Sequence, residues 1–186
     1  QNDIGLYEDL WQTIGAGRLW RGELLNKKKN GETYWSKQSI SPIKDEQGQI
    51  THFVSTSTDN TQLHEAQDTI KQLAFFDPLT KLANRRLLLD RLEHAVLSAK
   101  RHKENVAVFM LDLDNFKTIN DSLGHEYGDQ LLQHIALVLT DSVTSEDTVA
   151  RLGGDEFTIV VSNYQNELEL AEIADAILKR LEKPIL

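Results

Sequence analysis

Apolar and polar residues alternate along the first third of the chain in a pattern that predicts a small β-sheet. A short amphipathic segment at 6–14 precedes three strand-like stretches at 19–26, 33–43 and 49–58. The connectors between these stretches, KKKNGE and KDEQGQ, each contain a glycine, which is typical of tight turns. Three consecutive strands joined by tight turns predict an antiparallel meander.

A helical pattern follows at 61–76 and joins the two halves of the chain. Asp59 and Thr61 are candidates to cap its start. Its apolar residues repeat with the 3-4-3 spacing of a coiled-coil seam: Leu63, Ala66, Ile70 and Leu73. So short a repeat fits equally well a helix that packs on its own domain.

Helical and strand patterns alternate in the remaining residues, so we predict an α+β protein. The predicted helices are 84–101, 116–124, 127–143 and 166–183, and the predicted strands are 105–114, 148–152 and 156–161. If the strand at 105–114 stays regular, one of its faces carries Val106, Val108, Met110, Asp112 and Asp114. Asp114 or Asn115 can cap the helix that follows.

Composition narrows the function classes. Hydrophobic residues make up 40% of the 186, which is enough for a buried core, and no apolar run reaches the length of a membrane span. The net charge of −9 argues against DNA binding. Cysteine is absent, which excludes disulfides and thiolate metal sites and fits a reducing cytoplasm. The expected location is cytoplasmic, and an anchor elsewhere in a longer protein is compatible with it.

Three carboxylates stand out against this background. Asp112 ends a very apolar strand, where an ion is costly. Asp155 and Glu156 follow a Gly-Gly turn, which lets the backbone approach a ligand closely. Acids that converge from a strand end and a hairpin tip are typical of sites for hard divalent cations. On spacing alone, a solvated hairpin tip explains the same residues.

The segment LWRGELLNKKKNGETYWSKQSISPIKDEQGQITHFVSTSTDNT resembles the C-terminal half of a PAS sensor domain. The second half of the chain resembles the N-terminal two-thirds of the diguanylate cyclase GGDEF domain, through DPLTKLANRR, DLDNFKTINDSLGHEYGDQLL and ARLGGDEF in the family's order and spacing. The resemblance implies a PAS part at 1–60, a signalling linker helix at 61–76 and a GGDEF domain, incomplete at its C-terminus, at 77–186. It also implies a partial PAS antiparallel sheet and a palm like that of nucleotidyl cyclases, in which helices flank a central sheet. DNFKTINDSLGH and LEKPIL are similar to tandem proteins in which an EAL phosphodiesterase domain follows.

The family condenses two GTP molecules to cyclic di-GMP and releases pyrophosphate, and the resemblance implies this reaction under the control of the PAS part. The alternative is a catalytically weak regulatory module that binds GTP and controls a neighbouring domain. The implied cofactor is Mg²⁺ or Mn²⁺, and the implied assembly is a homodimer through the linker helix and the PAS domain.

Site residues are implied by matching the family motifs position by position. The implied metal ligands are Asp112, the carbonyl of Leu113, Asp155 and Glu156, and Asp155 and Glu156 are also the implied catalytic acids. Asn84 and Arg85 are implied to organise the fold. The implied substrate-binding residues are Asn115, Phe116 and Lys117 for the phosphates, Asn120 and Asp129 for guanine, and Gly154. The family's Arg-x-x-Asp product-inhibition site is replaced by TSED at 144–147, so tight feedback inhibition is not expected.

Overall fold

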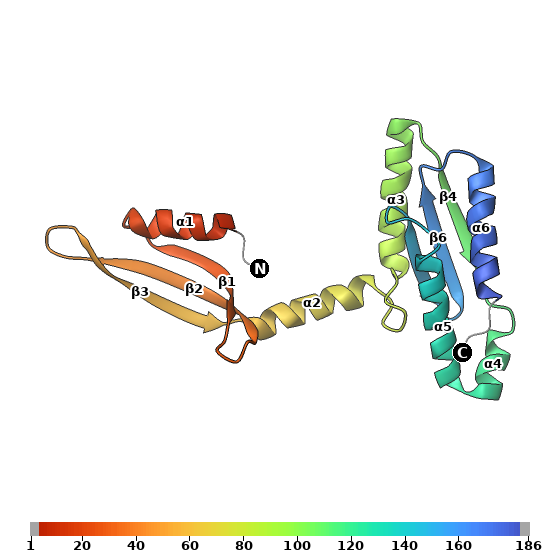
Figure 1. The fold of residues 1–186 in the computed structure, drawn as a ribbon, viewed down its shortest axis with the longest axis horizontal. Coiled ribbons are helices and arrows are strands. Elements are labelled where there is room, and N and C mark those ends of the chain that lie inside the picture. The colour runs from red at the N-terminus through yellow and green to blue at the C-terminus, as the bar shows by residue number, and fades with distance from the viewer. Residues whose placement is uncertain (1–3, 183–186) are drawn as a thin grey trace. The chain divides into compact units, whose positions relative to one another are not determined.

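The computed structural model of this chain describes residues 4–182. Two compact units divide between Ile70 and Lys71, inside one helix. The elements confirm the predicted α+β class, and Figure 1 labels them: α1 (Ile4–Gly15), β1 (Trp20–Lys27), β2 (Thr33–Lys44), β3 (Ile50–Asp59), α2 (Thr61–Phe75), α3 (Arg85–His102), β4 (Val106–Leu111), α4 (Phe116–Leu123), α5 (His125–Thr140), β5 (Thr148–Gly153), β6 (Glu156–Ser162) and α6 (Glu167–Leu181).

The first unit contains the predicted meander. Its strands are antiparallel in the order β1-β2-β3, and α1 packs on the face of the sheet that carries Trp20 and Leu24. Leu10 and Ile14 of α1 complete this small core. The indole nitrogen of Trp20 donates to the Asp9 carboxylate at 2.9 Å, which satisfies the polar atom of a buried ring.

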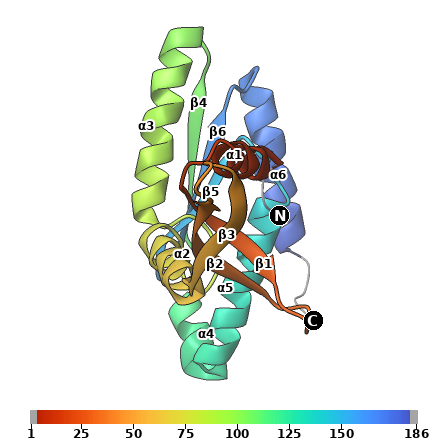
Figure 2. The ribbon, with the colours of Figure 1, turned by 90° about the vertical axis from the view of Figure 1, so that its left-hand side faces the viewer.

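The second unit has three layers, with a sheet of order β4-β6-β5 between helices (Figure 1). Alternate residues of β6 point to opposite faces. Ile159 and Val161 pack against α5 and α6, whereas Val160 packs against Leu88 of α3. Figure 2, viewed from the side, shows α3 and α6 on opposite sides of the strands. Phe157 and Ile159 of β6 and Leu139 of α5 are almost completely buried, so the sheet and α5 share the core that positions the residues at the ends of the strands.

Helix α3 begins and ends where side-chain chemistry favours it. The Asn84 side chain accepts hydrogen bonds from the amides of Arg86 and Leu87, as an N-cap does. Its amide nitrogen also donates to the Ala74 carbonyl at 3.0 Å, so Asn84 joins the end of α2 to the start of α3. Basic residues occupy the last turn, where they interact favourably with the helix dipole. The structure thus gives Asn84 an organising role.

Several predicted boundaries were wrong by a few residues. Strand β4 ends at Leu111 rather than 114, because the chain turns there toward α4. Helix α5 begins at His125 and ends at Thr140 rather than spanning 127–143, because α4 and α5 are separated by Gly124 alone. Helix α6 is described only to Leu181, and 183–186, with most of the LEKPIL segment, lie outside the described residues.

Candidate functional site

The Gly-Gly-Asp-Glu segment forms the tip of the β5–β6 hairpin. Gly153 pairs with Glu156, so Gly154 and Asp155 make the turn. Gly154 has φ 55°, in the left-handed region that favours glycine over residues with a side chain. Asp155 is half-buried and Glu156 is exposed. The hairpin therefore presents two carboxylates at one end of the sheet.

The end of β4 brings a third carboxylate to the same place. Leu111 pairs with Phe157 in the antiparallel register of β4 and β6. The next residue, Asp112, therefore lies beside Glu156, although the two are 44 positions apart in sequence. Asp112 is exposed, and the Leu113 side chain packs against the core. The expected alternation to Asp114 does not occur, because the strand has already ended.

The oxygen atoms of these residues suit Mg²⁺ or Mn²⁺, but three acidic side chains do not surround one point. Carboxylate and carbonyl oxygens are the ligands that hard divalent cations prefer. Within residues 4–182, however, no group of three or more His, Asp or Glu side chains is placed to hold a metal ion. Two carboxylates with the Leu113 carbonyl would instead make an open set, completed by water and substrate phosphates as is usual for Mg²⁺.

The loop before α4 differs from the sequence-based expectation. Asn115 precedes the helix in a left-handed conformation, with φ 61°, and its side chain makes no capping hydrogen bond. The expected side-chain cap by Asp114 or Asn115 was therefore wrong. The amides of Phe116, Thr118 and Ile119 bond to the Leu113 and Asn115 carbonyls, so few first-turn amides are free for phosphates. Lys117 is exposed in this turn, where its ammonium can reach an anion.

Asn120 and Gly128 form a close contact between α4 and α5. A Cβ atom added at residue 128 would collide with the Asn120 side chain, so glycine lets this side chain lie against α5 where it does. The Oδ1 atom of Asn120 is buried and has no hydrogen-bond partner among the described residues. A buried amide oxygen without a partner is costly, and a ligand N–H would satisfy it. Asp129 follows on α5 and is exposed.

An ion pair that the sequence analysis missed holds the hairpin tip. Arg151 donates to the Asp77 carboxylate at 3.0 Å, and its Nε and Nη2 atoms donate to the Gly154 carbonyl at 3.0 and 2.7 Å. Burial opposes ionisation of Asp77, but hydrogen bonds from Thr80 and Arg151 outweigh it and hold the pKa of Asp77 below its ordinary value. Both residues stand in quoted motifs, DPLT and ARLGGDEF, yet no spacing rule relates positions 74 residues apart.

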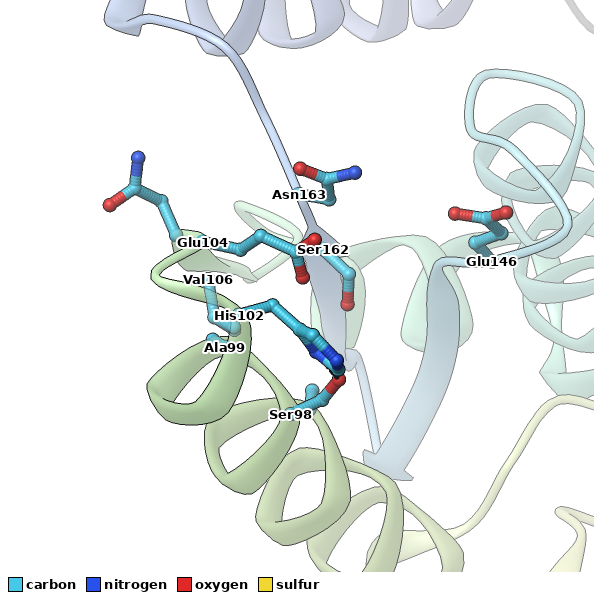
Figure 3. A pocket seen from close by; sticks show the side chains of 10 residues that line it. Ser98, Ala99, His102, Glu104, Val106, Glu146, Ser162 and Asn163 are labelled. Carbon is cyan, nitrogen blue, oxygen red and sulfur yellow. Dashed lines mark hydrogen bonds between the residues drawn. The ribbon is translucent and has the colours of Figure 1, made fainter.

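A separate pocket lies at the opposite end of the same sheet (Figure 3). It measures about 350 Å³ and is lined from α3, the start of β4 and the end of β6, with Ser98 and His102 pointing toward each other. The distance between Ser98 Oγ and His102 Nδ1 is 3.2 Å. None of the implied site residues lines this pocket, so it does not belong to the carboxylate site.

Comparison with protein families decides the assignment. The model for "Diguanylate cyclase, GGDEF domain" matches residues 74–186. The chain belongs to the GGDEF family. A PAS domain model matches residues 5–62, which confirms the resemblance of the first part of the chain to a PAS domain.

Curated relatives and solved structures agree with this assignment. The chain is 43% identical over 129 residues to the bifunctional diguanylate cyclase/cyclic di-GMP phosphodiesterase MucR of Pseudomonas aeruginosa, covering 69% of this chain and 19% of that protein. It is 38% identical over 124 residues to the diguanylate cyclase TpbB of the same species, covering 67% and 28%. The structure of the TpbB GGDEF domain aligns with a TM-score of 0.58 at 41% identity, over 59% of this chain and 64% of that one.

The chain thus spans 19% and 28% of the length of these two curated relatives. A structure of the coiled coil and GGDEF domain of DgcB from Caulobacter crescentus, in complex with c-di-GMP, aligns with a TM-score of 0.57 at 30% identity, over 62% of this chain and 60% of that one. No helix within residues 4–182 is long and apolar enough to cross a membrane.

Proposed function

We propose that the protein containing this chain is a diguanylate cyclase that condenses two GTP molecules to cyclic di-GMP and releases pyrophosphate. The observation that carries the proposal is the β4–β6 register, which sets Asp112 beside Glu156 at the GGDEF hairpin tip. Lys117 and Asn120, whose buried Oδ1 atom has no hydrogen-bond partner among the described residues, belong to the same unit. Family membership supports the proposal, since relatives such as TpbB are named diguanylate cyclases.

The proposed mechanism assigns a task to each side chain. Asp112, Asp155 and the Leu113 carbonyl would hold Mg²⁺ or Mn²⁺, which neutralises phosphate charge and lowers the pKa of a nearby hydroxyl. Glu156 accepts the proton of the attacking 3′-hydroxyl. That oxygen then bonds to the α-phosphorus of the second GTP, the bond from this phosphorus to the oxygen that bridges it to the β-phosphorus breaks, and pyrophosphate leaves. The 3′-hydroxyl of the second GTP attacks the α-phosphorus of the first in the same way, which closes the ring and releases the second pyrophosphate. Lys117, exposed in the first turn of α4, orients the terminal phosphates.

Because each GGDEF domain holds one GTP, we propose that the protein acts as a homodimer through α2 and the PAS part. No α2 residue is buried within the described chain. Leu63, Ile70 and Leu73 are 56%, 65% and 65% exposed, and together with Ala66 they form one seam. A second copy of α2 would cover this seam. The cytoplasmic location and PAS control remain predictions.

Incubation of the full-length protein with GTP and Mg²⁺ tests the activity. Cyclic di-GMP and pyrophosphate are expected in a ratio of one to two, measured by liquid chromatography with mass spectrometry and a pyrophosphate assay. ATP in place of GTP is the control and should give little product. GTP binding without turnover would favour the regulatory module, and no binding of GTP would reject both functions.

Base choice provides a prediction that depends on Asp129. A carboxylate can accept from both N1–H and the N2 amino group of guanine, whereas an amide places an NH₂ against one of these donors. Asp129→Asn is therefore expected to weaken binding of a GTP analogue by about tenfold, the loss of one hydrogen bond to a charged group. Calorimetry at fixed Mg²⁺ measures this, with Asp121→Asn on the exposed part of α4 as the matched control. Equal affinity in parent and Asp129→Asn would leave Asp129 as a helix-surface acid.

Product inhibition provides a second prediction. Asp147 is already engaged, because its Oδ2 accepts from the amide and hydroxyl of Thr144 at 2.9 and 2.8 Å, and its Oδ1 accepts from the Ser162 amide at 3.0 Å. The hydroxyl of Thr144 cannot make the bidentate contact of a guanidinium. Cyclic di-GMP should therefore inhibit the full-length enzyme only weakly at this loop, and Thr144→Arg should increase the inhibition. Tight inhibition of the parent that Asp147→Ala abolishes would contradict this prediction.

A further inference from the structure

The junction between the PAS sheet and α2 is held by more than the peptide chain. Strand β3 ends at Asp59 and α2 begins at Thr61, so Asn60 alone connects them. Trp35, on the middle strand β2, accepts a hydrogen bond from the Asn60 amide at 3.0 Å. The Trp35 amide donates to Thr61 Oγ1 at 3.0 Å. These bonds tie the start of α2 to β2.

A second set of contacts joins the start of α2 to β1, a strand that is not paired with β3. Both carboxylate oxygens of Glu23 are used, since Oε1 accepts from Asn60 Nδ2 at 2.8 Å and Oε2 lies 2.9 Å from His64 Nε2. The imidazole of His64 also stacks on the Trp35 ring, with centroids 4.5 Å apart and planes 17° from parallel. Glu23 therefore reaches across β2 to hold the first turn of α2.

The orientation of the Asn60 amide depends on this carboxylate. Its nitrogen faces Glu23, and its Oδ1 is buried without a hydrogen-bond partner among the described residues. Turning the amide over would place its oxygen against the carboxylate, so Glu23 holds Asn60 in an arrangement that leaves one polar atom unsatisfied. Lys37, opposite Glu23 in the β1–β2 register, is the charged neighbour on β2. The cost of the buried Asn60 Oδ1 atom thus offsets part of the favourable hydrogen bond from Asn60 Nδ2 to Glu23.

We propose that Glu23 is a latch, the carboxylate through which β1 holds the first turn of α2, and that releasing it changes the output of the GGDEF domain. Only the last clause rests on the proposed function. Since β1 also contacts α1 through Trp20 and Asp9, a change on the α1 face of the sheet has a physical connection to the linker helix. The peptide link from β3 provides no such connection to β1.

Hydrogen exchange tests the latch without any reference to catalysis. In the full-length protein, Glu23→Ala is expected to speed exchange of the Leu63 and His64 amides about fivefold, because both donate to the Asn60 carbonyl in the turn that Glu23 holds. His64→Phe keeps the ring stack and removes the contact with Glu23, so it should give part of the same increase. Glu46→Ala removes an exposed carboxylate from the β2–β3 turn and should change nothing. Unchanged exchange at Leu63 and His64 in Glu23→Ala would overturn the latch.

Turnover gives the second measurement. Cyclic di-GMP formation by full-length Glu23→Ala should differ from that of the parent by at least about threefold, while Glu46→Ala should match the parent. If the parent makes no cyclic di-GMP, the proposed function fails while the exchange result still decides the latch. Altered exchange with unaltered turnover in an active protein would overturn the claim that the latch controls output.

Discussion

Glu156→Gln in the full-length protein is expected to lower cyclic di-GMP formation by about 10²–10⁴-fold, the usual contribution of a general base. Glutamine keeps the size of the side chain but cannot accept the proton of the 3′-hydroxyl. Asp155→Ala should have an effect of similar size because it removes an implied metal ligand. Initial rates with GTP and Mg²⁺, measured from the cyclic di-GMP formed, check both variants.

Loss of folding should not contribute to this result. Glu156 is exposed at the first position of β6, and the hairpin glycines are unchanged, so the free energy of unfolding should shift by less than about 0.5 kcal/mol. Asp114→Asn is the matched control, since Asp114 is an exposed acid near the same site with no proposed role. Parent-like turnover in Glu156→Gln would refute the assignment of Glu156 as the base, and a loss of equal size in Asp114→Asn would show that total negative charge matters more than position.

Local sequence patterns predicted most of the architecture. The three PAS strands and their glycine turns could be predicted because alternation and turn chemistry are properties of neighbouring residues. The α3 start could be predicted because Asn84 caps it. The end of β4 could not, because the apolar pattern continues through Leu113, which packs on the core from a turn rather than from a strand.

The sequence motifs supplied candidate site residues but not the geometry that relates them. The motifs identified Asp112 and Glu156, whereas only the β4–β6 register shows that they are neighbours. The Glu23–His64 contact and the Asp77–Arg151 pair join residues 41 and 74 positions apart, and no periodicity relates such residues. The backbone conformation of Asn115 was also hidden, because the sequence favours Asn as a side-chain cap and the structure uses it in a left-handed turn.

Arg151→Ala is expected to reduce both stability and turnover, because Arg151 connects two parts of the GGDEF domain. The Arg151 and Asp77 side chains are only 10% and 15% exposed. Removing the guanidinium leaves a largely buried carboxylate with Thr80 alone and the Gly154 carbonyl without its side-chain donors, which should cost about 2 kcal/mol in the free energy of unfolding. Turnover should fall by about tenfold or more, because Gly154 immediately precedes the two acids and misplacement by 1 Å can cost that much. Urea unfolding and initial rates measure the two effects.

Two further variants separate charge from geometry. Arg151→Lys keeps the charge but cannot donate to Asp77 and the Gly154 carbonyl with the same rigid fork, so it should recover only part of either loss. Because the pKa of Asp77 is lowered in the folded state, its ionised form contributes stability that is present above its ordinary pKa and is lost as pH falls through the lowered value. Asp77→Asn should therefore be less stable than the parent at neutral pH and lose less stability on acidification. If Arg151→Ala has the parent's stability and turnover, then the contact with Gly154 does not position the hairpin, and the backbone of the Gly-Gly turn holds the acids without it.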